Sequence, residues 1–399
     1  MALHAQASEV QEGVSIIRGV RSRFYILGYH ELEIKVARFT LYLKPEKKEW
    51  NVKDTNWDDK RVLVTGGASF IGSHLVDKLV EMGANVTVLD NFSSGTLENL
   101  SQSRDKTNII TLDLEWCDLS ELVRVFKDQE VIFHLAATHG GRGYITTHPA
   151  DVSSNFAIDH HVFEASLKAN VEKVVSASSA CVYPPKLQDM TDSDYLLREE
   201  DSNPFQLNEP LSADLEYGWA KLIGEIQLIA FFKQYGLKGC SLRFVTAYGP
   251  RENETHAIIA LIYKAFEKMD PYQIWGSGEQ DRDFTYVSDI VEGTVRAAEK
   301  VTDGTPINLG TGVRYKVKDV ASKIFDAIGW KPGRITFDTS KPVGVATRAL
   351  DISKAKQLLN WEPTTSLDEG LRKTINWYVT THSRKGFVDE KVLMERSAG

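Results

Sequence analysis

Residues 61–91 have the hydrophobic pattern of a strand, a helix and a second strand, with a glycine-rich turn after the first strand. The first strand is predicted over Val62 to Val64, an apolar run typical of a strand that is buried on both faces. The turn is Thr65-Gly66-Gly67. Helical spacing links the next apolar residues, which are Ile71, Leu75, Leu79 and Met82. A short apolar run over Val86 to Leu89 predicts the second strand.

The same alternation continues to residue 245 and predicts an α/β fold with a doubly wound parallel sheet. Further strands are expected at 109–112, 131–136, 174–178 and 239–245, and helices at 119–126, 151–168 and 216–235. Later residues have a mixed pattern, with helices at 257–268, 287–299, 317–328 and 367–380 and short strands at 273–275 and 307–309. We therefore expect a Rossmann domain over 61–245, with a polar insertion at 184–212, and a smaller, mainly substrate-binding domain over 246–385.

The two ends of the chain do not follow this pattern. Alternating and β-branched residues between Val14 and Leu43 suggest a small hairpin-like extension, and the polar residues 44–60 predict a linker. Two interpretations of residues 1–60 stay open: a poorly ordered leader without a catalytic role, or an accessory or oligomerisation element. Residues 386–399 predict a frayed tail.

Composition places the chain among ordinary soluble proteins. It has 399 residues, of which 42% are hydrophobic and 26% charged, and its formal net charge of -8 argues against nucleic acid as a partner. The three cysteines (Cys117, Cys181, Cys240) show neither paired spacing nor a zinc signature, which predicts no metal and a reducing compartment such as the cytoplasm. We find no apolar run long enough to cross a membrane and no signal-peptide pattern.

The glycine turn predicts a dinucleotide site. Gly66 allows a tight turn, the helix after it offers unpaired N–H groups to a pyrophosphate, and Gly72 allows close packing of helix and strand. Asp90 follows at the spacing expected of a carboxylate that accepts the ribose hydroxyls and repels a 2′-phosphate, so we favour NAD over NADP. Ser69 stands where the usual pattern has glycine. Its small polar side chain narrows the space for the pyrophosphate, and we expect NAD to bind with some loss of affinity.

Two further stretches carry candidate chemistry. Tyr217 and Lys221 are four residues apart and share one face of the predicted helix, so the ammonium should favour the phenolate and make Tyr217 a general base. Ser179 ends the strand before them, where its hydroxyl can meet the reacting oxygen. By itself this spacing is common, and the glycine turn upstream strengthens the prediction. Residues 137–143, with three glycines after a strand, are either a ligand-binding loop or a flexible one.

Taken together, the motifs resemble the extended short-chain dehydrogenase/reductase group, in particular the NAD-dependent epimerase/dehydratase family that acts on nucleotide sugars. The matching segments appear in order between residues 65 and 363: TGGASFIGSHL, LDN, DLE, HLAA, SASSACVYP, YGWAK, LRFVTAYGPR, GSGEQDRDFTYVSD, INLG and NWEP. Several motifs in the correct order are far more specific than any one of them. Residues 1–60 lie outside the resemblance.

The resemblance implies a role for each matching residue. The NAD site would comprise Gly66, Ser69, Phe70, Ile71 and Gly72 at the pyrophosphate, Asp90 and Asn91 at the adenosine ribose, Asp113 and Leu114 at the adenine, and Leu135, Ala136 and Ala137 at the nicotinamide ribose. The catalytic residues would be Ser179, Tyr217 and Lys221, with Lys221 also touching the nicotinamide ribose. Substrate-binding residues would include Gly141 and Arg142. Arg282 would bind the diphosphate of the sugar nucleotide, since a guanidinium suits that contact, and Arg348 is a weaker candidate for the same role.

The implied mechanism moves a hydride from a sugar carbon to tightly held NAD while Tyr217 takes the hydroxyl proton. The keto-sugar then rotates or is reprotonated, and the hydride returns. Dehydratase and decarboxylase relatives carry an acid two residues beyond the catalytic hydroxyl. Here Ala180 and Cys181 follow Ser179, which argues against a dehydratase.

The segments HGGRGY and SSACVYP are similar to the GDP-mannose 3,5-epimerase branch, in which the cysteine that matches Cys181 acts as an acid/base. The alternative for Cys181 is a small buried residue. That branch has a lysine soon after Tyr-Gly-Pro, whereas residues 251–256 contain none, and Thr246 replaces the usual asparagine. His256 could titrate near neutrality, or it could be structural.

We therefore expect a C4 epimerase of a nucleotide sugar. The alternatives are a 3,5-epimerase-like enzyme that uses Cys181, a non-catalytic nucleotide-binding relative, and a net dehydrogenase. The resemblance also implies a homodimer that pairs through the predicted helices 151–168 and 216–235.

Overall fold

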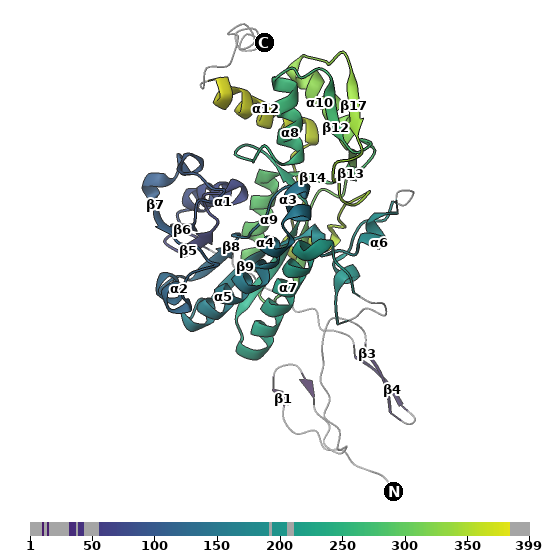
Figure 1. The fold of residues 1–399 in the computed structure, drawn as a ribbon. Coiled ribbons are helices and arrows are strands. Elements are labelled where there is room, and N and C mark those ends of the chain that lie inside the picture. The colour runs from purple at the N-terminus through teal and green to yellow at the C-terminus, as the bar shows by residue number, and fades with distance from the viewer. Residues whose placement is uncertain are drawn as a thin grey trace. The chain divides into compact units, whose positions relative to one another are not determined.

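The structure is a computed structural model that describes residues 56–190, 194–205 and 211–383, and the backbone of four short strands closer to the N-terminus (Figure 1). The chain divides into two compact units, Met1–Lys53 and Asp54–Gly399. In the first unit, β1 (Val10–Gln11) pairs with β2 (Val14–Ser15), and β3 (Leu32–Val36) pairs with β4 (Phe39–Leu43), both antiparallel. The second pair agrees with the expected hairpin-like extension.

A parallel sheet of seven strands forms the centre of the second unit (Figure 1). Its order is β15-β10-β9-β8-β5-β6-β7. The strands are β5 (Arg61–Thr65), β6 (Asn85–Asp90), β7 (Thr107–Thr111), β8 (Val131–His134), β9 (Lys173–Ser179), β10 (Lys238–Phe244) and β15 (Pro306–Leu309). The chain runs from β5 outward to β7 and then returns to β8 on the other side of β5. The predicted doubly wound α/β fold is confirmed, and its switch point lies between β5 and β8.

Helices cover both faces of this sheet, which explains the uninterrupted apolar run in β5. Val62 and Val64 belong to the core that includes α1 (Phe70–Glu81) and α9 (Val287–Lys300). Leu63 points to the other face and belongs to a second core. Three helices contribute to that second core: α2 (Leu119–Phe126), α5 (Asn155–Lys168) and α7 (Leu215–Tyr235).

Smaller elements complete the second unit. Its other helices are α3 (Arg142–Thr147), α4 (Pro149–Ser153), α6 (Pro185–Gln188), α8 (Ala257–Phe266), α10 (Val317–Ile328), α11 (Ser353–Leu359) and α12 (Leu367–Ser383). Three strand pairs lie outside the central sheet: β11 (Thr246–Tyr248) with β14 (Phe284–Tyr286), β12 (Tyr272–Trp275) with β17 (Ile335–Asp338), and β13 (Asp281–Arg282) with β16 (Tyr315–Lys316). Across the described residues, each helix is too short or too polar to cross a membrane.

Three elements differ from the sequence prediction. The expected helix over 151–168 is divided into α4 and α5, because a tighter turn at Ser154 interrupts the helical hydrogen bonds. The strand at 307–309 joins the central sheet as β15, although it follows residue 245 in the chain. The insertion 184–212 contains α6, and its Leu197 is buried and bridges to Leu350. Local patterns do not reveal such long-range pairing.

The predicted termini are only partly covered. Residues 44–55 of the expected linker and the tail 386–399 lie outside the described residues. Trp57 is buried and its indole N–H donates a 2.8 Å hydrogen bond to Glu299, so the end of the expected linker is packed as part of the second unit.

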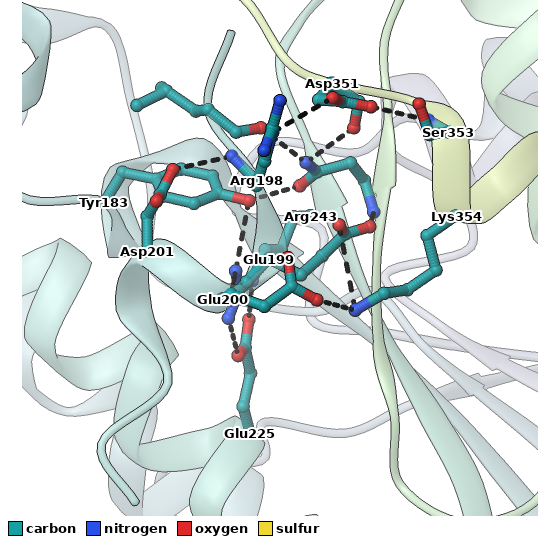
Figure 2. Close-up of polar contacts among 12 residues, drawn as sticks. Tyr183, Arg198, Glu199, Glu200, Asp201, Glu225, Arg243, Asp351, Ser353 and Lys354 are labelled. Atoms are coloured by element: carbon teal, nitrogen blue, oxygen red, sulfur yellow. Dashed lines mark hydrogen bonds and ion pairs between the residues drawn. The ribbon is translucent and has the colours of Figure 1, made fainter. Parts of the chain in front are cut away.

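A buried polar network fastens α7 to the sheet; Figure 2 shows most of it, and we call it the Arg243 network. The Arg243 guanidinium donates two hydrogen bonds to the Glu225 carboxylate, at 2.9 and 2.7 Å. It also donates to the Tyr183 hydroxyl and to the Glu199 carbonyl. Tyr183 donates in turn to Asn308 of β15. The network therefore ties α7, β10, β15 and the 184–212 segment together.

Candidate active site

The turn between β5 and α1 requires glycine at two positions. Gly66 has φ +67°, and a Cβ there would lie 2.9 Å from the Ala136 nitrogen. A Cβ on Gly72 would lie only 2.0 Å from the Gly66 carbonyl oxygen. The turn thus passes close to the loop after β8, and α1 packs directly against the turn, as a dinucleotide site requires.

The first turn of α1 is available to an anion. Ser69 is its N-cap residue, but its side chain makes no capping hydrogen bond and its Oγ lies 3.1 Å from the Ser94 Oγ. Phe70 and Ile71 begin the helix, which runs for 12 residues. Backbone N–H groups at such an end carry partial positive charge and suit a pyrophosphate.

The carboxyl ends of β6 and β7 carry the residues predicted to bind the adenosine. Asp90 is buried, and its carboxylate accepts hydrogen bonds from the Ala68 N–H at 2.9 Å and the Phe92 N–H at 2.8 Å. Asn91 donates to Asp113 at 2.9 Å. The Leu114 side chain packs into the core, so only its backbone is left to meet an adenine. A carboxylate fixed beside the glycine turn fits NAD, which would supply a hydride acceptor when bound.

A chain of polar side chains leads from the predicted nicotinamide pocket to Lys221. The Ala136 N–H donates to the Thr65 hydroxyl at 3.1 Å, and Thr65 Oγ1 lies 2.8 Å from His134 Nδ1. His134 Nε2 lies 3.0 Å from Asp159 Oδ1. The same oxygen lies 3.7 Å from Lys221 Nζ. Leu135 and Ala137 are the sequence neighbours of Ala136, at which this set of hydrogen bonds begins.

The structure brings Ser179, Tyr217 and Lys221 to the carboxyl end of β9 as predicted, but with different electrostatics from those expected. Ser179 Oγ accepts a 3.1 Å hydrogen bond from the Cys181 N–H. Burial raises the pKa of Tyr217, Cys181 and Asp159 raise it further, and a hydrogen bond with Ser179 opposes them. The expected lowering of the pKa of Tyr217 is therefore wrong for the protein alone, because burial, Cys181 and Asp159 together raise it.

Three arginines predicted to bind substrate lie near one buried carboxylate that the sequence did not single out. Arg142 Nη1 lies 2.9 Å from Asp214 Oδ1, and Arg348 Nη2 lies 2.7 Å from Asp214 Oδ2. Arg348 Nη1 also donates to Cys181 Sγ at 3.3 Å. Burial lowers the pKa of Arg282 to about 10, and the charges of Arg348 and Arg142 contribute. The cluster is therefore a cationic site with Asp214 at its centre.

A cavity of about 500 Å³ opens beside this cluster. Its lining includes Arg142, Asp214, Trp219 and Gly344. Burial alone would raise the pKa of Asp214, but the Arg348 and Arg142 guanidiniums outweigh burial and hold it below its usual range. The aspartate stays ionised at neutral pH and orients both arginines.

Two histidines lie together near Lys221. His256 Nδ1 lies 3.1 Å from Glu252 Oε1, and the His139 and His256 rings have their centroids 6.1 Å apart. Burial lowers the pKa of His139 to about 4, with contributions from His256 and Lys221. Burial acts against protonation of His256, but Glu252 outweighs it and raises the pKa of His256. A Cβ on Gly141 would lie 2.5 Å from the Thr255 carbonyl, so these two loops touch.

The sequence reasoning missed Asp159, His139 and Asp214. Asp159 stands in a predicted helix, three and four residues before Val162 and Phe163, and an acid on an apolar helix face is a usable signal. Asp214 lies three residues before Tyr217 at a helix start, where it is hard to tell from an ordinary N-cap.

Comparisons with known proteins agree with this geometry. The sequence model described as "NAD dependent epimerase/dehydratase family" matches residues 62–310. The chain is 32% identical to the UDP-glucose 4-epimerase of Mycolicibacterium smegmatis, covering 80% of this chain and 98% of the relative. A UDP-glucose 4-epimerase from Thermotoga maritima, solved with UDP-glucose, is 31% identical with a TM-score of 0.71, covering 80% and 99%. MoeE5, solved with UDP-glucuronic acid and NAD, is 31% identical with a TM-score of 0.68, covering 80% and 99%.

Proposed function

The chain belongs to the NAD-dependent epimerase/dehydratase family, and from that premise we propose that it is a nucleotide-sugar epimerase that uses NAD to invert C4 through a transient keto-sugar. The observation that carries this proposal is that Ser179, Tyr217 and Lys221 lie at the same end of the parallel sheet as the glycine turn. Similarity to UDP-glucose 4-epimerases supports the same reaction and suggests a UDP-sugar as substrate.

In this proposal each site residue has a defined task. Tyr217 takes the proton of the sugar hydroxyl, and Ser179 holds that oxygen by a hydrogen bond. Lys221 stabilises the phenolate that forms. The keto-sugar then rotates in the site, so that the hydride returns to its opposite face and Tyr217 gives the proton back to the oxygen. This chemistry needs no further acid or base, which suits the Ala180 and Cys181 that follow Ser179.

We propose that Arg282 and Arg348 bind the diphosphate of the substrate. Two guanidiniums provide the paired donors that phosphate oxygens accept. Arg142 and Gly141, at the start of α3, would then face the sugar. Asp214 would hold Arg142 and Arg348 in place while the substrate enters.

Proton NMR in heavy water tests the reaction. The purified protein is incubated with NAD and a panel of UDP- and GDP-sugars. We expect a C4 epimer without deuterium, because the hydride that leaves the carbon returns to it. Tyr217→Phe is the control and should abolish the conversion. If the wild-type protein converts no sugar in the panel, the proposal fails.

The alternative is a 3,5-epimerase-like enzyme. One observation favours it: Cys181 Sγ accepts a hydrogen bond from Arg348, so the thiol lies at the arginine cluster and not in the core. Such an enzyme would exchange protons next to a carbonyl. Deuterium at C3 or C5 in the NMR experiment, lost in Cys181→Ser, would establish this alternative and contradict simple C4 inversion.

We also propose a homodimer that pairs through α5 and α7. Both helices carry exposed apolar side chains, among them Phe156, Ile223 and Tyr235. Light scattering of the purified protein tests this, and a monomer would contradict it. The three cysteines are free, which is consistent with the predicted reducing compartment such as the cytoplasm.

A further inference from the structure

Asp159 is a buried acid in the middle of the candidate active site. It is 1% exposed, and Lys221 beside it is 3% exposed. A buried carboxylate or ammonium is costly unless it has a partner and hydrogen bonds. The 3.7 Å separation between Asp159 Oδ1 and Lys221 Nζ makes each the counter-charge of the other.

The fold makes room for this carboxylate. Asp159 lies on α5 and faces Gly224 on α7. A Cβ on Gly224 would lie 2.2 Å from Asp159 Oδ2, closer than any real contact. Gly224 is one turn after Lys221 on the same helix, so the gap that admits the carboxylate also places it beside the ammonium.

A series of hydrogen bonds that runs from Ala136 through Thr65 and His134 also holds the Asp159 carboxylate in place. If Thr65 accepts from the Ala136 N–H and donates to His134 Nδ1, a neutral imidazole carries its proton on Nε2 and donates it to Asp159 Oδ1. Each group then acts within its normal donor and acceptor capacity. The position of Asp159 is thus tied to the end of β5 and the loop after β8.

We propose that Asp159 is a positioning residue that holds the Lys221 ammonium in its catalytic place and links it, through His134 and Thr65, to the nicotinamide end of the cofactor site. This deepens the proposed function and rests on it. Lys221 needs a fixed place because it must serve Tyr217 and the cofactor at once. A flexible lysine side chain does not keep one geometry without a buried partner.

The charges around Tyr217 give the proposal a measurable consequence. Ser179 and Cys181 face Tyr217 from β9 and the turn after it, and Asp159 faces it from α5. Lys221 lies one turn along α7, and His139, with a pKa of about 4, is neutral at pH 7. Removing the negative charge of Asp159, while the less firmly held Lys221 ammonium stays in the site, should make the Tyr217 phenolate easier to form.

Asp159→Asn tests the proposal, with Glu164→Gln as the matched control on the outer part of α5, where Glu164 pairs with Lys168. We expect kcat to fall on the order of tenfold to a hundredfold, because Lys221 loses its anchor. We also expect the acidic limb of the kcat profile to move by about one pH unit to lower pH. If both quantities match those of Glu164→Gln, the proposal is overturned.

A second variant covers the case in which Asp159→Asn does not fold. Gly224→Ala leaves the charge in place and displaces the carboxylate, since the added methyl group occupies its position. We expect kcat to fall severalfold while the unfolding remains cooperative. A folded Gly224→Ala protein with wild-type kcat would contradict the proposal.

NAD affinity separates failure of this proposal from failure of the proposed function. Calorimetric titration with NAD needs no sugar, and a displaced Lys221 should weaken NAD binding severalfold in Asp159→Asn relative to Glu164→Gln. If the wild-type protein converts no sugar, the epimerase proposal fails and this titration alone decides the role of Asp159. An unchanged Kd would then overturn that role.

Discussion

Two buried ion pairs on α7 are made of similar charges and are built in opposite ways. Arg243 donates two hydrogen bonds to Glu225, at 2.9 and 2.7 Å. A further nitrogen of its guanidinium donates to the Tyr183 hydroxyl and the Glu199 carbonyl (Figure 2). Lys221, four residues before Glu225 on the same face, lies 3.7 Å from Asp159. The N–H groups of the arginine thus bond to groups of the protein, which stabilises the position of α7. In the proposed mechanism, the lysine keeps donors for the cofactor and for Tyr217.

The first way to test this contrast is to remove the lysine. We expect Lys221→Met to lower kcat by about 10²–10⁴-fold, because the phenolate of Tyr217 loses its stabilising charge. Asp159 keeps its contact with His134 but loses its counter-charge, so we also expect a loss of stability in urea, and kcat carries the contrast. Lys233→Met, an exposed lysine on the same helix, serves as the control and should keep wild-type kcat. Activity within tenfold of wild type in Lys221→Met would remove the contrast.

Removing the arginine should instead affect stability. We expect Arg243→Met to lower the free energy of unfolding by about 3–5 kcal/mol, because Glu225 is left buried and unpaired. The double variant Arg243→Met with Glu225→Leu should recover most of that loss, since no buried charge remains. Urea unfolding measures both variants. A loss in the double variant as large as in the single one would show that the pair is not the source of the effect.

Asp214 lies between the two cases, the Arg243–Glu225 pair and the Lys221–Asp159 pair. Its carboxylate pairs with two arginines of the candidate substrate site. Its pKa in the folded protein is lowered, so the stability it contributes is present above its unfolded pKa and is lost as the pH falls through its folded pKa. We expect Asp214→Asn to show a smaller loss of stability between pH 6 and acidic pH than the wild-type protein. This is the smallest of the three effects. Urea midpoints measured along the pH series test it, and parallel curves would contradict it.

Much of the site could be predicted because its residues belong to local patterns. The glycine turn, Asp90 and the Tyr217–Lys221 spacing each lie within one short segment, where backbone geometry and helical periodicity fix the relation between residues. The electrostatics of Tyr217 could not be predicted in this way. They depend on burial, on Cys181 and on Asp159, which the tertiary structure brings to Tyr217 from other elements.

The sequence by itself determined the alternation of strands and helices and the family, and it indicated the candidate pair Tyr217 and Lys221, since each depends on neighbours along the chain. Only the tertiary structure decided that residues 306–309 complete the central sheet and that Asp214 joins Arg142 to Arg348. It also decided that Asp159 lies beside Lys221. These contacts form between segments far apart in sequence, where packing, and not local periodicity, selects the partner.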